Sequence, residues 1–363
     1  MTEFIQIHIL ASYPPSNLNR DDLGRPKTAI LGNTQRLRIS SQSLKRAWRQ
    51  SELFQSALAG HIGIRTREMG NKIAAALSTG STLKNVLACT GEPASRKAVS
   101  QKEAQEWARL IAEQFGKVTT KENDLKTEQI VHYSPEEISA IDALLEKCAM
   151  SGKGPEEKDL DLLRKNHTAV DIAMFGRMFA NTPAYNTEAA VQVAHAITVH
   201  DVVVEDDYFT AVDDLNRLET DAGSAHIGQF EFASGLYYIY MCIDRDRLEG
   251  NLGGNRELAS RAIAALTEAA TKVAPAGKQA SFASRAYASY LLAERGTQQP
   301  RSLAVAFVRP IRDEEVLSSA IRALEETRTK IEKVYGRCCD EWVSMNTVTG
   351  EGSLESVLKF VAR

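Results

Sequence analysis

Apolar and polar residues alternate at the start of the chain, where isoleucine recurs at every second position between residues 4 and 10. This period of two predicts a strand with one buried face. Runs rich in Val, Ile, Tyr and Ala predict further strands at residues 191–200, 234–243 and 302–308. The segment between the first strand and position 34 contains Pro and Gly and is expected to be a long loop that carries function.

A helix is expected from near Gln42, with Ser40 or Ser41 as its N-cap. Leu44 and Trp48 turn toward a core on the helical wheel. The opposite face collects polar side chains at helical spacing, namely Gln42, Lys45, Arg46 and Arg49. Residues 59–180 are also predicted to be helical, since Ser100 with Glu103 and Ser134 with Glu137 fit capping boxes. Two later helices are expected at residues 256–273 and 313–334.

The order of these elements, without the insertions, is strand, helix, strand, strand, helix, strand. This order is typical of the α+β, ferredoxin-like fold, in which two helices cover one face of a four-stranded antiparallel sheet. We therefore assign residues 1–58, 181–200 and 223–363 to the ferredoxin-like domain. Residues 59–180 form a large helical insertion, and residues 201–222 lie at the tip of the central hairpin.

The composition is that of a globular protein, with 43% hydrophobic and 25% charged residues. No apolar run approaches the ~20 residues needed to cross a bilayer. The segment after Met1 has neither a basic region nor a cleavage site of small residues, so we expect no signal peptide. Together with five cysteines, an odd number, this favours a cytoplasmic protein without disulfides.

Charge is distributed unevenly, although the net charge is only -3. Residues 1–50 contain eight Lys or Arg against three acidic residues, whereas residues 201–222 contain eight Asp or Glu against one Arg. Two segments of opposite sign in one chain favour head-to-tail association of identical copies, which generates a filament when the ring does not close.

The first helix is surrounded by cations that have few acidic neighbours in the sequence. They are Arg36, Arg38, Lys45, Arg46 and Arg49. Because the N-terminus of a helix offers backbone donors and partial positive charge, these side chains together indicate a phosphate-binding surface. Lys27 in the preceding loop is a further candidate for a phosphate contact. The alternative is a solvated face that keeps the helix soluble.

Catalytic motifs are absent from the sequence. It contains no Walker-type loop, no Gly-x-Ser-x-Gly and no His-Glu-x-x-His, and its seven histidines are scattered. We expect no metal and no cofactor. Asp21 and Asp22 are the acidic residues nearest the basic helix, where a carboxylate could act as a base or metal ligand toward RNA. The alternative is that they form an ion pair or a turn.

The acidic segment also carries apolar side chains, at Tyr208, Phe209, Val212 and Leu215. A hairpin tip that cannot bury such residues in its own domain inserts them into another surface or between bases. A small local core is the alternative interpretation.

Several motifs, in this order along the chain, resemble the CasC family of the RAMP superfamily. These motifs occupy residues 19–22, 38–47, 171–178, 194–198, 208–214, 223–228 and 251–254. Proteins of this family are the CRISPR RNA (crRNA) binding backbone subunits of the type I-E CRISPR Cascade complex. The resemblance implies a ferredoxin-like, RRM-type palm, a helical fingers domain and a β-hairpin thumb.

The resemblance also implies roles for individual residues and for partners. Contacts with the RNA are implied for Arg20, Lys27, Arg38, Ser40, Gln42, Lys45, Arg46, Arg49, Met178, Phe209, Thr210 and Val212. Met178 is expected to wedge against bases, and Phe209, Thr210 and Val212 of the thumb to flip out a base at regular intervals. The implied partners are crRNA, target DNA paired with the guide, neighbouring copies, CasA, CasB, CasD, CasE and a helicase-nuclease recruited to the complex in antiviral defense.

Two enzymatic alternatives remain at this stage. In the first, the chain is a metal-dependent ribonuclease, like backbone subunits of type III systems, with Asp21 or Asp22 as the catalytic residue. In the second, it is a guide-processing endonuclease, which requires a catalytic histidine near the RNA. His8 is the candidate, provided that the fold brings it close to the basic helix.

Overall fold

The computed structural model describes all residues except 1, 91–93, 122–123, 180–181 and 212–225. The chain forms two compact units. The sheet unit consists of Met1–Ala57, Val191–Arg245 and Ser260–Arg363, and the helical unit consists of Leu58–Ala190 and Asp246–Ala259. Each is described by itself below.

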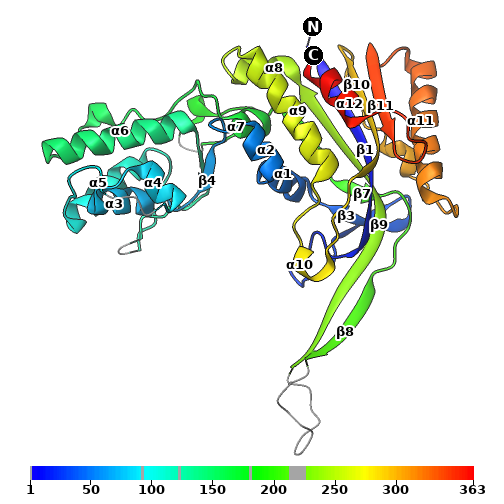
Figure 1. Ribbon diagram of the computed structural model, residues 1–363, viewed down its shortest axis with the longest axis horizontal. Coiled ribbons are helices and arrows are strands. Elements are labelled where there is room, and N and C mark those ends of the chain that lie inside the picture. Colours follow the sequence, from blue (N-terminus) through cyan, green and yellow to red (C-terminus); the bar gives the residue numbers. More distant parts are fainter. Residues whose placement is uncertain (1, 91–93, 122–123, 180–181, 212–225) are drawn as a thin grey trace, which may run out of the picture. The chain divides into compact units, whose positions relative to one another are not determined.

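An antiparallel sheet organises the sheet unit, with the strand order β11-β10-β1-β9-β7-β3-β2 (Figure 1). Its strands are β1 (Phe4–Ser16), β2 (Thr28–Leu31), β3 (Thr34–Ile39), β6 (Val191–Val193), β7 (Ala196–Thr198), β8 (Glu205–Ala211), β9 (His226–Asp244), β10 (Ala288–Gly296) and β11 (Glu341–Asn346). Strands β6 and β8 also pair with β9. The central order β10-β1-β9-β7 is that of the ferredoxin-like α+β fold, as the sequence predicts.

Both faces of this sheet are covered. Its helices are α1 (Ser41–Arg49), α2 (Glu52–Ala57), α9 (Arg256–Lys272, of which the part from Ser260 on belongs to this unit), α10 (Gln279–Phe282), η3 (Ala304–Phe307), α11 (Val316–Tyr335) and α12 (Leu354–Ala362). Helix α11 and the η3 turn cover one face through a cluster that includes Leu10, Tyr238 and Leu324. Figure 1 shows α9 and α12 on the opposite side of the sheet from α11.

The prediction of a strand at residues 302–308 is wrong. This segment contains the η3 turn, and the strand that pairs with β1 on this side of the sheet, between β1 and β11, is β10. Leu303 and Phe307 are buried whereas Val305 is 59% exposed. A strand would place all three side chains on one face, but a helical turn separates the middle one from the other two.

Two other segments also differ from their predictions. The expected loop before position 34 is partly a strand, because β1 continues to Ser16 and β2 precedes β3. The expected strand at residues 191–200 is divided into β6 and β7. Helices α9 and α11 agree closely with their predicted ranges.

The helical unit has its own apolar core. Its elements are β4 (Ile64–Thr66), α3 (Met69–Thr79), α4 (Leu83–Ala88), α5 (Gln101–Glu113), β5 (Val131–Tyr133), α6 (Pro135–Ser151), η1 (Glu157–Asp159), α7 (Val170–Phe175), η2 (Pro183–Tyr185) and α8 (Arg245–Asn251, of which all but Arg245 belongs to this unit). Trp107, Ile111 and Leu145 are buried in the core. The predicted caps are confirmed, since Ser100 accepts from the backbone of Glu103, and Ser134 with Glu137 forms a full capping box.

Strand β8 and the facing part of β9 form a two-stranded ribbon, which runs out from the sheet (Figure 1). In this ribbon Glu205–Ala211 pairs with residues 226–232, and Phe209 lies opposite Gly228. Val212 and the acidic residues that follow it lie outside the described residues. The assignment of residues 59–180 as fingers and 201–222 as a thumb stays a prediction.

Candidate nucleic-acid interface

The N-terminus of α1 is fixed by two side chains. Ser40 is the N-cap, and its hydroxyl accepts a hydrogen bond from the backbone of Ser43. The backbone N-H of Ser40 donates to Oδ1 of Asn19 at 2.8 Å. The predicted cap is therefore confirmed, and Ser40 joins the start of α1 to the loop that holds Arg20.

The two faces of α1 differ as the sequence predicts. Leu44 and Trp48 are buried, at 1% and 0% exposure. The other face carries the predicted binding residues, of which Gln42 and Arg46 are exposed and Lys45 and Arg49 are half-buried. Burial lowers the pKa of the Lys45 ammonium group from its ordinary value. The first turn contains no acidic residue, so an anion there meets no repulsion from the helix itself.

Backbone hydrogen bonds bring Arg20, Lys27 and Arg38 to the same region. The N-H of Lys27 donates to the carbonyl of Asn19, and the N-H of Arg38 donates to the carbonyl of Lys27, both at 2.8 Å. The backbone of Arg20 pairs with that of Pro26 in an isolated antiparallel β-bridge. We call the surface formed by these segments and α1 the basic surface: Arg20, Lys27, Arg38, Ser40, Gln42, Lys45, Arg46 and Arg49.

His195 is a residue of this region that the sequence reasoning missed. Its Nδ1 lies 2.8 Å from Nη1 of Arg38. Burial first, and then the charges of Arg38 and Lys27, lower the pKa of His195. The imidazole is therefore neutral near pH 7 and accepts a hydrogen bond from Arg38. Its position within the motif at residues 194–198 was the available signal.

Arg36 does not belong to the basic surface, contrary to the prediction from the sequence. It is 0% exposed. Its guanidinium donates to the carbonyls of Thr198 and Phe307, each at 2.9 Å. Because these acceptors occupy the guanidinium inside the protein, Arg36 stabilises the fold and is not available for a phosphate.

Asp21 and Asp22 line a hollow of about 830 Å³ beside α1, together with Arg20 and Arg46. The Asp21 carboxylate accepts hydrogen bonds from the backbone of Leu23 and Arg25, both at 2.9 Å. These bonds, led by the one from Arg25, lower its pKa. Asp21 therefore stabilises a turn, in agreement with the alternative interpretation, while Asp22 is exposed.

The remaining predicted residues lie on other parts of the chain. Phe209 and Thr210 are exposed on the ribbon of the sheet unit, Phe209 at 40%. Met178 belongs to the helical unit and is 78% exposed, next to a hollow of about 290 Å³ that Ile130 and Phe179 also line. Val212 lies outside the described residues.

His8 is too deeply buried to be the catalytic histidine of a guide-processing endonuclease. It is 0% exposed, and its ring nitrogens contact the hydroxyl of Tyr238 and the carboxylate of Glu294. Glu294 also pairs with Arg301 and Arg328. Among the described residues, one group has metal-ligand character, and it consists of Glu294, Glu332 and Cys339. The two arginines that already pair with Glu294 oppose the binding of a cation there.

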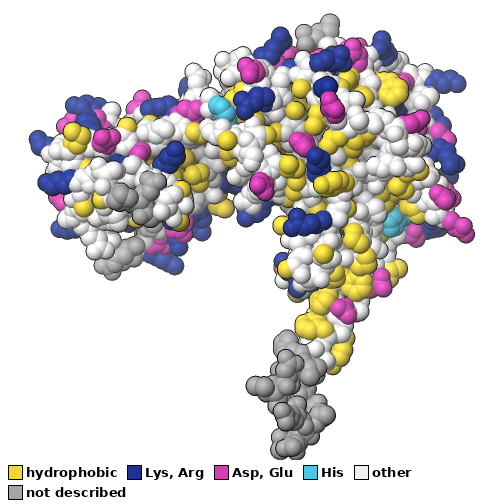
Figure 2. Space-filling model, in the orientation of Figure 1, with side chains coloured by type: hydrophobic (Ala, Val, Ile, Leu, Met, Phe, Trp, Pro, Cys, Tyr) yellow, Lys and Arg dark blue, Asp and Glu magenta, His cyan; other side chains and the backbone are white. Residues whose placement is uncertain are grey.

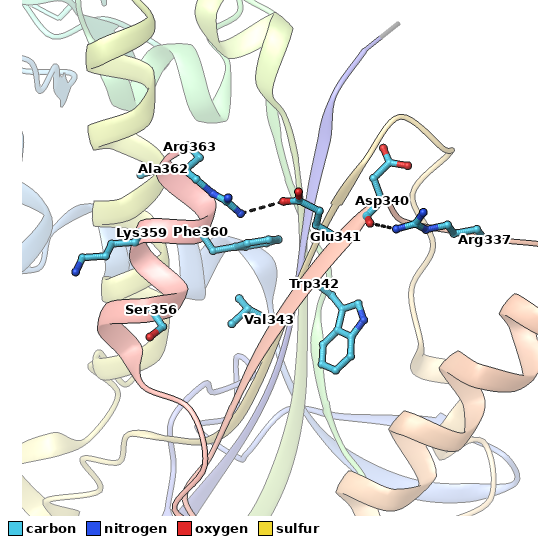
Figure 3. A pocket seen from close by; sticks show the side chains of 10 residues that line it. All are labelled: Arg337, Asp340, Glu341, Trp342, Val343, Ser356, Lys359, Phe360, Ala362 and Arg363. Carbon is cyan, nitrogen blue, oxygen red and sulfur yellow. Dashed lines mark hydrogen bonds and ion pairs between the residues drawn. The ribbon is translucent and has the colours of Figure 1, made fainter.

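A third hollow, of about 960 Å³, lies between β11 and α12 (Figure 3). Phe360 points toward β11, whereas Trp342 points away from α12. Arg363 donates to the carboxylate of Glu341 and Arg337 to the carbonyl of Asp340. Arginines bordering this hollow are thus already paired within the chain, which distinguishes it from the basic surface.

The fold defines a ferredoxin-like protein with a large helical insertion and a basic surface along helix α1. The chain belongs to the CT1975-like protein family, whose model matches residues 5–358. A solved structure described as "CRISPR RNA-guided surveillance complex, pre-nicking" contains a similar chain at 28% identity, with a TM-score of 0.81 and 99% of each chain covered. A second, described as "CRISPR RNA-guided surveillance complex", has 22% identity, a TM-score of 0.70 and the same coverage, and shows the fold alone.

A comparison with curated proteins gives no match. In the part of the chain that the structure describes, no helix is both long and apolar enough to cross a membrane.

Proposed function

We propose that this chain is a non-catalytic backbone subunit of a Cascade-type CRISPR surveillance complex. Multiple copies polymerise along crRNA, bind its phosphates, flip bases at regular intervals with the hairpin and present the guide for pairing with target DNA. The basic surface is the observation that carries this proposal, since it places cations and hydroxyl groups along α1 and on the loop that is joined to its N-cap. The similarity to a chain of a surveillance complex over 99% of its length supports it.

The chemistry of the basic surface favours binding without regard to sequence. Guanidinium, ammonium and hydroxyl groups recognise phosphate oxygens, which are the same at every nucleotide. A guide must vary in sequence, so its carrier gains from contacts that do not read bases. Recognition of the target is then left to base pairing with the guide.

The partners follow from this assembly. Neighbouring copies bind head to tail, and the other subunits of the type I-E complex, CasA, CasB, CasD and CasE, contact the filament or its ends. A helicase-nuclease is recruited to the whole complex after target pairing. The opposite charges of residues 1–50 and 201–222 support contact between copies, because complementary fields guide such association.

The absence of catalysis is part of the proposal. Asp21 stabilises a turn and forms an ion pair with Arg25, in which Oδ2 of Asp21 lies 3.2 Å from Nε of Arg25. A carboxylate committed in this way is a poor general base. Asp22 is exposed beside Arg20 and Arg46, so it is the residue on which the ribonuclease alternative depends.

The ratio of absorbance at 260 and 280 nm of the purified protein tests RNA binding. We expect the wild-type protein to carry RNA, and the double change Lys45→Ala and Arg49→Ala to remove most of it. The double variant should also reduce the slope of log affinity against log salt by about 1.4, at ~0.7 for each single-strand phosphate contact. Lys330→Ala with Arg322→Ala is the matched control, because these cations belong to α11.

Unchanged RNA content in the Lys45→Ala, Arg49→Ala variant would show that the basic surface is not the binding site. A Mg²⁺-dependent cleavage of RNA that disappears in Asp22→Ala would show that the chain is a ribonuclease and not a non-catalytic scaffold.

A further inference from the structure

Aromatic rings connect the ribbon to the short helix α10. The Phe209 ring lies 5.4 Å from the ring of Phe230, centroid to centroid. The Phe230 ring in turn meets Phe282 of α10 edge to face at 5.5 Å, with an interplanar angle of 87°. Phe232 lies 6.1 Å from the same Phe282 ring. Phe282 is therefore the residue of α10 that contacts both inner rings of the ribbon.

The position of the Phe209 ring depends on Gly228, its partner across the ribbon. A Cβ atom at Gly228 would come within 2.2 Å of this ring. The ring thus lies over the bare backbone of the opposite strand, which only glycine permits. With Gly228 below and Phe230 beside it, Phe209 still exposes 40% of its surface. The Phe209 ring is therefore fixed in position, and part of its surface is open to a ligand.

Lys278 places a cation at the same point. Its Nζ lies over the Phe230 ring, 5.4 Å from the centroid. Lys278 has a φ of +52°, and Ala283 at the other end of α10 has a φ of +46°. A left-handed backbone is unfavourable for a residue with a side chain. Both ends of α10 carry this cost, so its shape is imposed by its surroundings and is not a propensity of the sequence.

The segment before α10 belongs to the wall of the hollow beside α1. Val273 and Gly277 line that hollow together with Arg20 and Arg46. A Cβ at Gly277 would come within 2.2 Å of the carbonyl oxygen of Leu18, so the two backbones are in close contact. Asn17 also donates to the carbonyls of Gly24 and Glu231, each at 2.9 Å, which joins the loop of the basic surface to the ribbon.

Figure 2 shows hydrophobic side chains on the surface of the ribbon and at its base. Within the sheet unit, the Asn17 side chain therefore joins the loop of the basic surface to the ribbon, and the close contact of Gly277 with Leu18 joins that loop to the segment before α10. A single-stranded nucleic acid has the same two components, a chain of phosphates and bases that stack on aromatic rings.

We propose that α10 is a second wall of the RNA-binding surface, where Phe282 is a positioning residue and Lys278 a binding residue. Phe282 fixes Phe230, and Phe230 fixes the ring of Phe209 against which a base of single-stranded RNA stacks. Lys278 neutralises a phosphate next to that base. This inference rests on the proposed function, since it names further residues for the same ligand.

Titration of single-stranded RNA that contains 2-aminopurine tests the proposal with the full-length protein. Binding should quench the fluorescence of a 2-aminopurine base stacked on Phe209. Phe282→Leu keeps apolar volume but removes the ring, and should reduce both the quenching and the affinity, the latter about fivefold, near the lower end of a stacking contact. Phe282→Tyr should restore both. Tyr335→Ala removes an exposed ring at the end of α11 and is the control.

Lys278→Ala should weaken binding and lower the slope of log affinity against log salt by about 0.7, as expected for one phosphate contact. Lys330→Ala is the control for the loss of one positive charge. If Phe282→Leu leaves the quenching unchanged, or if Lys278→Ala gives the same salt slope as the control, α10 has no such role. Failure of the wild-type protein to bind RNA would instead overturn the proposed function.

Discussion

Two regions of the sheet unit use arginine in opposite ways. Around Glu294, Arg301 and Arg328 are half-buried and pair with a carboxylate that is 0% exposed. At the basic surface, Arg46 is exposed to solvent on a helix whose first turn contains no acidic residue. The residue type is the same, but the acceptors differ. The arginines around Glu294 are held by a carboxylate of the fold, whereas an exposed arginine such as Arg46 can meet a ligand from solvent.

Strand β3 shows this difference within a few residues. Arg36 and Arg38 are two positions apart, so they lie on the same face of the strand. Arg36 is fully buried because Phe307 and Val308 lie over it and accept its hydrogen bonds. Arg38 is half-exposed beside His195. What covers a cation, and not its strand position, decides whether an anion in solvent can reach it.

The largest expected effect comes from removing the buried carboxylate. Glu294→Gln leaves Arg301 without a charged partner and Arg328 with Glu332 alone, and should lower the free energy of unfolding by about 3–5 kcal/mol. Denaturant unfolding followed by circular dichroism measures it. Glu355→Gln is the control, because its ion pair with Lys359 is exposed, with side-chain exposures of 76% and 74%.

The pH dependence of this effect follows from the pKa of Glu294. Burial alone would raise this pKa, but the hydrogen bonds from His8 and Arg301 outweigh it and the pKa lies below its ordinary value. A lowered pKa adds stability above the unfolded value near ~4.3, and this stability is lost as the pH falls further. The difference between wild type and Glu294→Gln should therefore shrink below about pH 4. A constant difference would contradict the buried ion pair.

A smaller loss of stability is expected from Arg36→Met. The carbonyls of Thr198 and Phe307 lose a charged donor in a buried place, at a cost of about 2–3 kcal/mol. Arg38→Met on the same face should change the free energy of unfolding by less than about 0.5 kcal/mol, because the site is partly solvated. Equal losses of stability in the two variants would contradict the distinction between Arg36 and Arg38.

Local patterns predicted α1 well. The N-cap at Ser40 and the burial of Leu44 and Trp48 follow from neighbours within one or two turns, which the sequence displays directly. The ferredoxin-like fold could be predicted from the order of elements along the chain, although the last central strand is β10 and not residues 302–308. The turn at residues 304–307 could not, since its apolar run suits a strand as well as a helical turn against the sheet.

The candidate site was predicted in part. Cations on α1 and its preceding loop lie at the surface as expected, because their positions depend on local spacing. Arg36 was wrongly included, since the residue that covers it, Phe307, is distant in the sequence. His195 and Phe282 were missed for the same reason: Arg38 and Phe230, which they contact, belong to other segments of the chain.

The smallest effect tests the role of His195 beside Arg38. Arg38→Ala should weaken RNA binding about five- to tenfold at low salt and lower the salt slope by ~0.7, since one phosphate contact is lost. His195→Ala removes no charge near pH 7, because the pKa of His195 is lowered by burial and by its cationic neighbours. It should therefore leave the slope unchanged and weaken binding about twofold, a loss of ~0.4 kcal/mol through a less ordered Arg38. Fluorescence anisotropy at several salt concentrations separates these outcomes. A reduced slope in His195→Ala would mean that the imidazole itself carries charge at the RNA.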